Sequence, residues 1–452
     1  MGKSITNGAI PYIDFVDNKP PGIWYLTAAS FQLFGTTFYT ARYVLYFTNA
    51  LSAIIMLLIG IQIKNRKIGL ISALFLLFGF LVPAYQGYLA LTEPFLSLFS
   101  LLGLLFFLKG QKQKTYLVLC GFAIGLATLF KQTGLFLLVA IGIYYLCSFW
   151  ISDNRNKEYL LGKTKDCLLL MIGFLLPILA VIVYFWNLGA LHQLVYYTLS
   201  SLLGYGMQVT NFGLIIYQLA SFAVIWVLCL ISFIIVVYKF LKQTSDWKTM
   251  VSLWFILTFV PLLFRQFGHY YIQILPPACL LAAITMNDII PKIIKTTRIG
   301  ELFRGANTKY VLVTVLGLII VVLSLGTSVS GYVLNRGEAT DSLQDQLQTA
   351  SYVRSNTENN DKILVYPYEP SIYFLSDRDP CVKLLILVPS IGKDLESDLL
   401  QEIINNEPKI VVMQTTSDRV IIGLSLIYDY LVNHFHEVER IHTYAIFLKN
   451  NY

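Results

Sequence analysis

The chain has 452 residues, of which 56% are hydrophobic and only 13% are charged, and its mean hydropathy is +0.65. Several apolar runs are long enough to cross about 30 Å of hydrocarbon, which excludes an ordinary soluble protein and predicts a polytopic α-helical membrane protein. The formal net charge of +7 reflects the basic loops of such a protein, so no nucleic-acid partner is expected.

The first informative element is a polar, proline-rich segment at residues 11–25, PYIDFVDNKPPGIWY, directly ahead of the hydrophobic series. Asp14, Asp17 and Lys19 place two carboxylates and a cation beside the expected membrane surface, which indicates a functional site. The apolar run from Gly22 to Phe34 is too short to span a bilayer and is expected to form a helix at the interface. Residues 1–39 are therefore interpreted as an outer loop and juxtamembrane helix that carry the PYxDF-x-DNKPPG motif.

A transmembrane helical domain is expected at residues 40–334, because apolar segments of about spanning length follow one another there. We expect about ten transmembrane helices, near residues 40–63, 68–84, 91–108, 115–130, 134–150, 167–187, 212–238, 250–264, 270–287 and 310–332.

Lysine and arginine residues predict the orientation, because short loops rich in them stay in the cytoplasm. Alternate loops, at 64–67, 109–114, 155–165, 239–248 and 292–309, hold eighteen of these residues. The intervening connections hold only Lys131 and Arg265. The N-terminal motif and everything after about Leu334 are thus expected on the extracytoplasmic side of a multi-pass plasma (inner) membrane protein.

The composition changes after about residue 335. Hydrophobic runs shorten to strand length there, as at 362–366 and 409–413, and they alternate with helical patterns such as 394–406. Residues 335–452 are expected to form a small extracytoplasmic α/β domain, which could be a lid, an acceptor-binding module or a structural cap. It has no glycine-rich phosphate loop and no GxSxG motif, so an independent nucleotide site or hydrolase is not expected.

Ionisable residues of the helical region gather at the expected outer ends of helices and in outer loops. Charge at the edge of hydrocarbon is costly unless it is paired or hydrated, so it marks functional sites. A transporter more often places such groups near the midplane between repeated halves, and this chain shows no internal repeat. The pattern favours a reaction centre at the outer surface, formed from Asp14, Asp17, Lys19, Arg42, Glu93, Lys131, Arg265 and His269.

Four short motifs carry a family resemblance. Residues 8–15, GAIPYIDF, and 17–22, DNKPPG, resemble the first outer loop of the GT-C membrane glycosyltransferases, in the branch that includes protein O-mannosyltransferases and the lipid A aminoarabinose transferase. Later segments agree in order: LTEP at 91–94, GLA at 125–127 leading to KQT at 131–133, and HYY at 269–271 leading to LPP at 275–277. The resemblance covers nearly the whole chain, including the outer C-terminal domain.

The resemblance implies transfer of a sugar from a polyprenyl-phosphate-linked donor to a glycan, lipid or protein acceptor, by an inverting displacement at the outer face. A carboxylate would deprotonate the acceptor hydroxyl, and cations would stabilise the departing lipid phosphate. No cofactor is required; a divalent metal is compatible with this chemistry but is not indicated. The implied roles are catalytic for Asp14 and Asp17, donor-phosphate-binding for Lys19, Lys131 and Arg265, and substrate-binding for Tyr12, Glu93, Gln132, His269 and Tyr270.

Each of these roles has a structural alternative. The lysines could anchor the chain to lipid headgroups, the two aspartates could cap turns near proline and asparagine, and Glu93 could be stabilised by the start of a helix. His269 could be a hydrogen-bonded interfacial residue, and the tyrosines could belong to an aromatic belt.

One departure from the family pattern keeps other functions open. The family has a transmembrane helix before the first outer loop, followed by an acidic residue that is its usual candidate base, and this sequence begins after that point. Either the translation start is too far downstream, or Asp14 or Asp17 takes the role, or the protein is not catalytic. The alternatives to a glycosyltransferase are a non-catalytic GT-C-like membrane subunit and a lipid or solute transporter or flippase.

Overall fold

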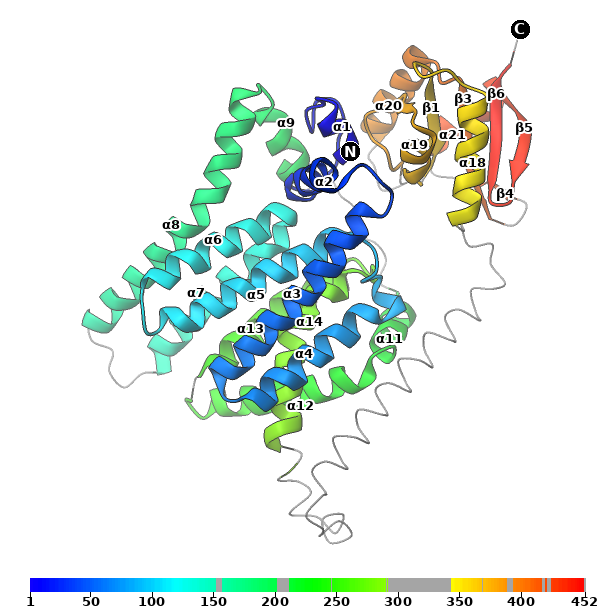
Figure 1. The fold of residues 1–452 in the computed structure, drawn as a ribbon. Coiled ribbons are helices and arrows are strands. Elements are labelled where there is room, and N and C mark those ends of the chain that lie inside the picture. Colours follow the sequence, from blue (N-terminus) through cyan, green and yellow to red (C-terminus); the bar gives the residue numbers. More distant parts are fainter. Residues whose placement is uncertain are drawn as a thin grey trace, which may run out of the picture.

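The chain forms a bundle of apolar helices, a small α/β domain, and an N-terminal segment that lies between them (Figure 1). The computed structural model describes residues 1–151, 157–200, 211–244, 246–289, 291, 343–367, 369–387, 393–416, 419–420 and 424–450. The expected span at 310–332 and the expected domain boundary near residue 335 lie outside these ranges.

The bundle is that of a multi-pass membrane protein. The sequence predicts about ten spans. In the described part of the chain, six segments are long and apolar enough to cross a membrane: Thr40–Ile63, Thr92–Gly110, Gln132–Ile151, Lys157–Asn187, Ala223–Leu241 and Tyr270–Ile289. Two further apolar helices, Thr115–Phe130 and Trp247–Leu263, are shorter. The bundle helices are α3 (Thr40–Ile63), α4 (Arg66–Leu81), α5 (Thr92–Gly110), α6 (Thr115–Phe130), α7 (Phe136–Ile151), α8 (Lys157–Asn187), α11 (Phe212–Ala220), α12 (Ala223–Leu241), α13 (Trp247–Phe259) and α14 (Tyr270–Ile284).

Helix α14 is the centre of the bundle. Every residue from Tyr271 to Ile284 is buried, and the helix packs against α4, α5, α12 and α13. A helix that is hydrophobic all round is typical of such a buried position. The N-terminal end of α14 is therefore surrounded by neighbours, and residues there can meet side chains from several helices.

Helices α6 and α8 approach each other closely because glycines face the contact. A Cβ on Gly121 would lie 2.0 Å from the Leu170 carbonyl oxygen, and one on Gly173 would lie 2.0 Å from that of Val118. Small residues of this kind let helix backbones touch where no hydrophobic effect drives association. The rest of α8 leaves many large apolar side chains exposed, as a lipid-facing helix would.

The expected single span at 212–238 is wrong. The structure divides it into α11 and α12, with a break at Ser221–Phe222. Near the break, the Tyr85 hydroxyl donates to the Gln218 carbonyl at 2.9 Å, and the Gln218 amide donates to the Gln266 carbonyl at 3.1 Å. These bonds satisfy backbone and side-chain groups that a helix end leaves open, and the local sequence has no glycine or proline to predict the break.

The α/β domain has a mixed sheet with helices on both faces. The strand order is β2 (Asp379–Pro380), β1 (Lys362–Tyr366), β3 (Ile410–Thr416), β6 (Tyr444–Lys449) and β5 (Phe435–Ile441), and β4 (Arg419–Val420) pairs with β3. β1 is parallel to β2 and β3, while β6 is antiparallel to β3 and β5. The strands expected at 362–366 and 409–413 and the helix expected at 394–406 are confirmed.

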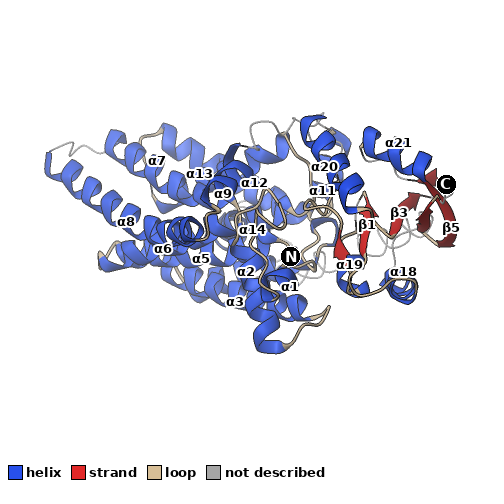
Figure 2. Cartoon of the chain, turned by 90° about the horizontal axis from the view of Figure 1, so that it is seen from above, coloured by secondary structure: helices blue, strands red, loops and turns tan. Residues whose placement is uncertain are grey.

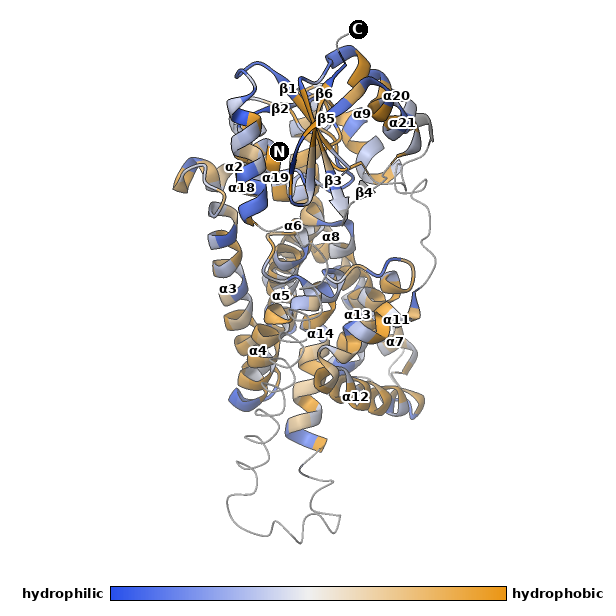
Figure 3. Cartoon of the chain, turned by 90° about the vertical axis from the view of Figure 1, so that its right-hand side faces the viewer, coloured by the Kyte–Doolittle hydropathy of each residue, from blue (hydrophilic) through white to orange (hydrophobic). Residues whose placement is uncertain are grey.

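Alternate residues of β1 point to opposite faces of this sheet. Leu364 and Tyr366 share one apolar cluster with α20 (Lys393–Asn406) and α21 (Ser425–His434). Ile363 and Val365 share another with α18 (Leu343–Ser355) and α19 (Ser371–Ser376). The contrast with the bundle is clear in Figure 3, where the bundle is mostly hydrophobic and the outer faces of the α/β domain are hydrophilic.

The N-terminal segment touches both bodies. Its helix α2 (Gly22–Phe34) has the bounds expected from sequence, and a short helix α1 (Gly2–Thr6) precedes it. Met1 packs against the core of the α/β domain, and the Val16 amide donates to the Lys383 carbonyl at 3.0 Å. Seen from above, the N-terminus lies beside α19 and β1 (Figure 2). The motif at 11–22 is thus held between the bundle and the domain.

Candidate functional site

Tyr12 shapes the motif loop from inside. Its backbone has a φ of 69°, in the left-handed region, and its buried ring contacts Phe185 at the end of α8, with the ring centroids 5.6 Å apart. Burial raises the pKa of the Tyr12 hydroxyl, which therefore stays protonated and donates to the Lys19 carbonyl at 2.7 Å. Tyr12 thus positions Lys19 and does not present its hydroxyl to solvent.

Lys19 and Asp17 form a local ion pair. The Lys19 ammonium lies 3.1 and 3.2 Å from the two Asp17 carboxylate oxygens, and the Lys19 backbone amide also donates to Asp17 at 3.1 Å. The Asp17 side chain is 10% exposed and that of Lys19 is 36% exposed. The Trp24 ring lies 6.0 Å from the ammonium, and its indole N–H is enclosed without a hydrogen-bond partner.

Asp14 has a different environment from Asp17. It is exposed, and its carboxylate accepts a hydrogen bond from the Ile10 backbone amide at 2.7 Å. This is the geometry of an aspartate that caps its own turn.

A buried ion pair connects α5 to the end of α6. Glu93 is the second residue of α5 and is 2% exposed, while Lys131 lies between α6 and the short helix η2 (Gln132–Leu135) and is 12% exposed. The Lys131 ammonium is 2.5 Å from the Glu93 carboxylate and 3.4 Å from the centroid of the Tyr270 ring. The charge of Lys131 is thus balanced on one side by a carboxylate and on the other by an aromatic face.

His269, which precedes α14, borders this pair. Its Nε2 lies 3.8 Å from Glu93, and its Nδ1 lies 3.2 Å from the side-chain oxygen of Gln86. Burial lowers the pKa of His269 to about 4, and the charges of Lys131 and Lys19 add to this effect although Glu93 opposes it. The imidazole is therefore neutral at neutral pH, and its contact with Glu93 is not an ion pair.

Gln132 joins the two ion pairs into one region. Its amide donates to the Asn18 carbonyl at 2.9 Å and to the Thr198 carbonyl at 2.8 Å. The turn that carries Lys131 is thereby fixed beside the motif loop that carries Lys19. We refer to this set as the motif cluster: Asp17, Lys19, Glu93, Lys131, Gln132, His269 and Tyr270.

Arg265 lies near the same end of the bundle. It is half-buried in the segment between η4 (Val260–Leu263) and α14, four residues before His269. Within the described ranges, no group of three or more histidine, cysteine or acidic residues could hold a metal ion.

Two glutamines of the site were not predicted. Gln86 contacts His269 from a turn where its own φ is 54°, and nothing in the local sequence marks it. Gln273 accepts from the Thr133 hydroxyl at 2.7 Å, and its amide N–H group is enclosed without a partner. A glutamine within the apolar run of α14 is a signal that could have been used, because polar residues inside membrane helices are rarely neutral to function.

Comparison with known proteins places this arrangement in a known architecture. The sequence model of the dolichyl-phosphate-mannose-protein mannosyltransferase family matches residues 18–184, which include most of the motif cluster. The structure of ArnT from Cupriavidus metallidurans bound to undecaprenyl phosphate superposes with a TM-score of 0.57 over 99% of this chain and 91% of that chain, at 14% identity. The chain has the fold of the GT-C superfamily of membrane glycosyltransferases.

Other GT-C structures agree. Apo ArnT from the same organism gives a TM-score of 0.57 at 15% identity, over 95% of this chain and 87% of that chain. The archaeal oligosaccharyltransferase AglB from Archaeoglobus fulgidus, in complex with an inhibitory peptide and a dolichol-phosphate, gives 0.59 at 12% identity over 91% of this chain. The chain spans 64% of the length of that enzyme. A comparison with curated protein sequences gives no match.

Proposed function

We propose that this protein is a glycosyltransferase that moves a sugar from a polyprenyl-phosphate-linked donor to an acceptor at the extracytoplasmic membrane surface. The observation that supports this most is the motif cluster itself, where Gln132 fixes the Lys131 turn against the loop of Asp17 and Lys19. A cation, a carboxylate and neutral donors meet there at one end of an apolar bundle. A lipid-linked phosphate needs that combination, because its chain stays in the bilayer while its reacting atoms need polar partners.

Lys19 is the proposed ligand of the donor phosphate. It is the more exposed of the two lysines in the motif cluster, and its partner Asp17 is only two residues away. Lys131 is already held by Glu93 and Tyr270, so its proposed role is to keep the site in shape. The enclosed N–H groups of Trp24 and Gln273, which lack partners, are further donors for a polar ligand.

Asp17 is the proposed base. Both Asp17 carboxylate oxygens lie within hydrogen-bond distance of the Lys19 ammonium, so they are occupied while Lys19 stays in place. Donor phosphate that binds Lys19 competes for this cation and releases an Asp17 oxygen, which is then open to accept the proton of the attacking hydroxyl. In this sequence of events, donor binding activates the base.

The ligands of structurally similar proteins support the donor class. Undecaprenyl phosphate and dolichol-phosphate are bound in the ArnT and AglB structures, and the matching family is named for a dolichyl-phosphate sugar. These ligands share a phosphate on a long isoprenoid chain. The sugar and the acceptor are not part of that common chemistry.

The test is transfer by the purified full chain from a panel of radiolabelled polyprenyl-phosphate sugars, with undecaprenyl phosphate binding measured in parallel. Lys19→Gln should weaken phosphate binding, and Asp17→Asn should keep binding but lower transfer by about 100-fold or more. Lys112→Gln, an exposed lysine in the loop between α5 and α6, is the control and should change neither. Full transfer by Lys19→Gln and Asp17→Asn would contradict the proposal, and lipid binding without transfer from any donor would favour a non-catalytic subunit.

A further inference from the structure

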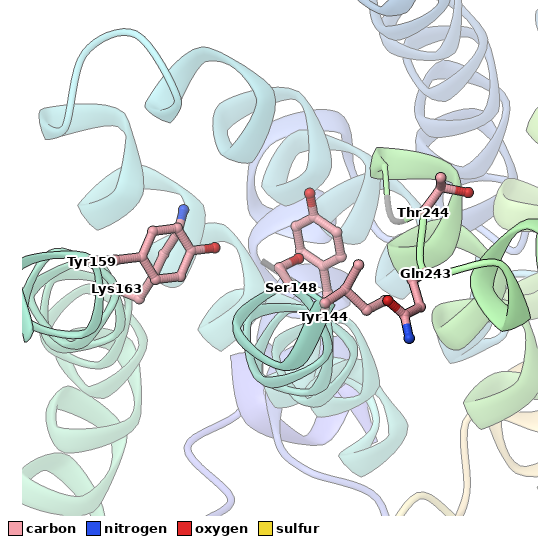
Figure 4. Close-up of a pocket in the computed structure, with 7 residues that line it drawn as sticks. Tyr144, Ser148, Tyr159, Lys163, Gln243 and Thr244 are labelled. Carbon is pink, nitrogen blue, oxygen red and sulfur yellow. The ribbon is translucent and has the colours of Figure 1, made fainter. Parts of the chain in front are cut away.

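A polar depression lies at the opposite end of the bundle from the motif cluster. Its volume is about 430 Å³, and its lining comes from three elements: Tyr144, Ser148 and Ile151 of α7, Tyr159 and Lys163 of α8, and Gln243 and Thr244 after α12 (Figure 4). Helix α7 starts directly after η2, beside Lys131, and its 16 residues span about 24 Å. Helix α8 carries Phe185, which packs on Tyr12, at its other end. The depression is therefore separate from the proposed transfer site.

The lining combines one cation with several hydroxyl and amide groups. In Figure 4 the Tyr159 hydroxyl points toward Tyr144 and Ser148. The Ser148 hydroxyl is enclosed beside the Tyr144 hydroxyl without a well-formed hydrogen bond, although a buried hydroxyl of this kind normally has one. A ligand with acceptor oxygens would satisfy it.

Lys163 keeps its charge available for such a ligand. The carboxylate near it, Asp166, is held by Lys114 at 2.6 Å and lies 3.9 Å from Lys163. The Lys163 ammonium instead lies over the rings of Tyr145 and Tyr159, at 4.5 and 5.7 Å from their centroids. These rings hold the cation without neutralising it.

The surroundings have the character of a membrane surface. The same ends of α8 and α12 carry further lysines, at 157, 165, 239 and 242, and a smaller depression beside the first is lined by Lys239, Asp246 and Lys248. Large apolar side chains are exposed nearby, including Leu146, Trp150, Leu160 and Leu241. Acyl chains would find apolar contacts there while a headgroup reached Lys163.

We propose that this depression binds the phosphate of an anionic ligand, of the kind that a lipid headgroup or a soluble phosphate compound carries. Lys163 supplies the charge, Ser148 and the tyrosine hydroxyls donate hydrogen bonds to the phosphate oxygens, and the volume suits a headgroup-sized group. The site lies at the lysine-rich end of the bundle and does not depend on the proposed transfer reaction.

The test measures thermal unfolding of the purified full chain in neutral detergent, with phosphatidylglycerol, phosphatidylcholine or inorganic phosphate added. Binding to the folded state raises Tm, so phosphatidylglycerol should raise it by about 3 °C or more in the wild type. Lys163→Gln and Ser148→Ala should lose most of this shift. Lys165→Gln removes the same charge from an exposed position on the same helix and should keep it.

The probes separate the two ligand sources. A shift with both phosphatidylglycerol and inorganic phosphate that needs Lys163 supports recognition of the phosphate itself, and a shift with phosphatidylglycerol alone supports a lipid headgroup. Equal shifts in Lys163→Gln and Lys165→Gln would overturn the proposal, because they would show that the general basic surface is sufficient. The absence of a shift with either probe would overturn it as well.

Discussion

The Lys131 ammonium lies 2.5 Å from the Glu93 carboxylate, and this buried ion pair ties the start of α5 to the end of α6. Both groups are almost completely removed from solvent, with side chains 12% and 2% exposed. Each therefore depends on the other for its charge to be tolerated, and the pair behaves as one structural unit.

Glu93→Gln should destabilise the protein. The substitution leaves the Lys131 ammonium without its counter-charge, and breaking a buried pair in this way costs about 3 kcal/mol. Thermal unfolding in detergent measures the loss. The double variant Glu93→Gln/Lys131→Met should recover most of it, and Glu158→Gln, an exposed glutamate of α8, should match the wild type. A fully stable single variant would show that Lys131 has another partner of equal strength.

His269 should make the protein acid-sensitive. Burial holds its folded-state pKa at about 4, whereas an unfolded histidine titrates near 6.5. Between these values the unfolded chain binds more protons, so stability falls as the pH drops from about 6.5 to 4 and is unaffected by this group above about 7.

His269→Gln should remove up to about 2 kcal/mol of the stability difference between about pH 7 and pH 4.5, with the partly exposed ring taken into account. Unfolding at the two pH values measures it, with His192→Gln, an exposed histidine, as the control. An unchanged pH dependence in His269→Gln would mean that other groups cause the acid sensitivity.

Gln132→Ala should loosen the motif loop. The amide no longer bridges the carbonyls of Asn18 and Thr198, and each lost hydrogen bond costs about 1 kcal/mol. Faster limited proteolysis within residues 8–20 is the direct readout, and transfer should fall about tenfold because Lys19 is less well positioned. Gln113→Ala, in an exposed loop at the other end of α5, serves as the control. Unchanged proteolysis would show that Tyr12 alone is sufficient to hold the loop.

Two glycines of α8 should respond in opposite ways to alanine. A Cβ at position 173 meets the Val118 carbonyl oxygen, whereas one at position 162 meets nothing within 4 Å. Gly173→Ala should destabilise the protein by about 1–3 kcal/mol through overpacking. Gly162→Ala should be neutral or stabilising by up to about 1 kcal/mol, because alanine favours the helix. Similar Tm values for the two variants would contradict the close α6–α8 contact.

Sequence patterns predicted the elements well where a single physical rule decides them. The helix at Gly22–Phe34 and the strand at Lys362–Tyr366 have the bounds expected from sequence. Each is a hydrophobic run with a glycine or a proline at one of its ends, and these residues mark where the element stops. The break at Ser221–Phe222 was missed because hydrogen bonds from Tyr85 and to Gln266, both distant in sequence, accompany it. No local pattern contains that information.

The sequence pointed to residues that the structure brings together, but it did not predict how they pair. The positions of charged residues near the ends of predicted helices indicated which of them could meet, but the pairing of Lys131 with Glu93 and of Lys19 with Asp17 depends on side-chain geometry. Sequence patterns do not distinguish Asp14 from Asp17. In the structure, Asp14 is an exposed residue that caps its own turn, whereas Asp17 is a shielded carboxylate beside Lys19.

The hydrogen bond from the Val16 amide to the Lys383 carbonyl connects the α/β domain directly to the motif. Asp17 is the next residue along the chain, and Tyr12 on the other side is fixed to α8. A displacement of the domain must therefore either break this contact or shift the carboxylate relative to its lysine. The α/β domain is for this reason structurally coupled to the motif, and its position affects the geometry of Asp17 and Lys19.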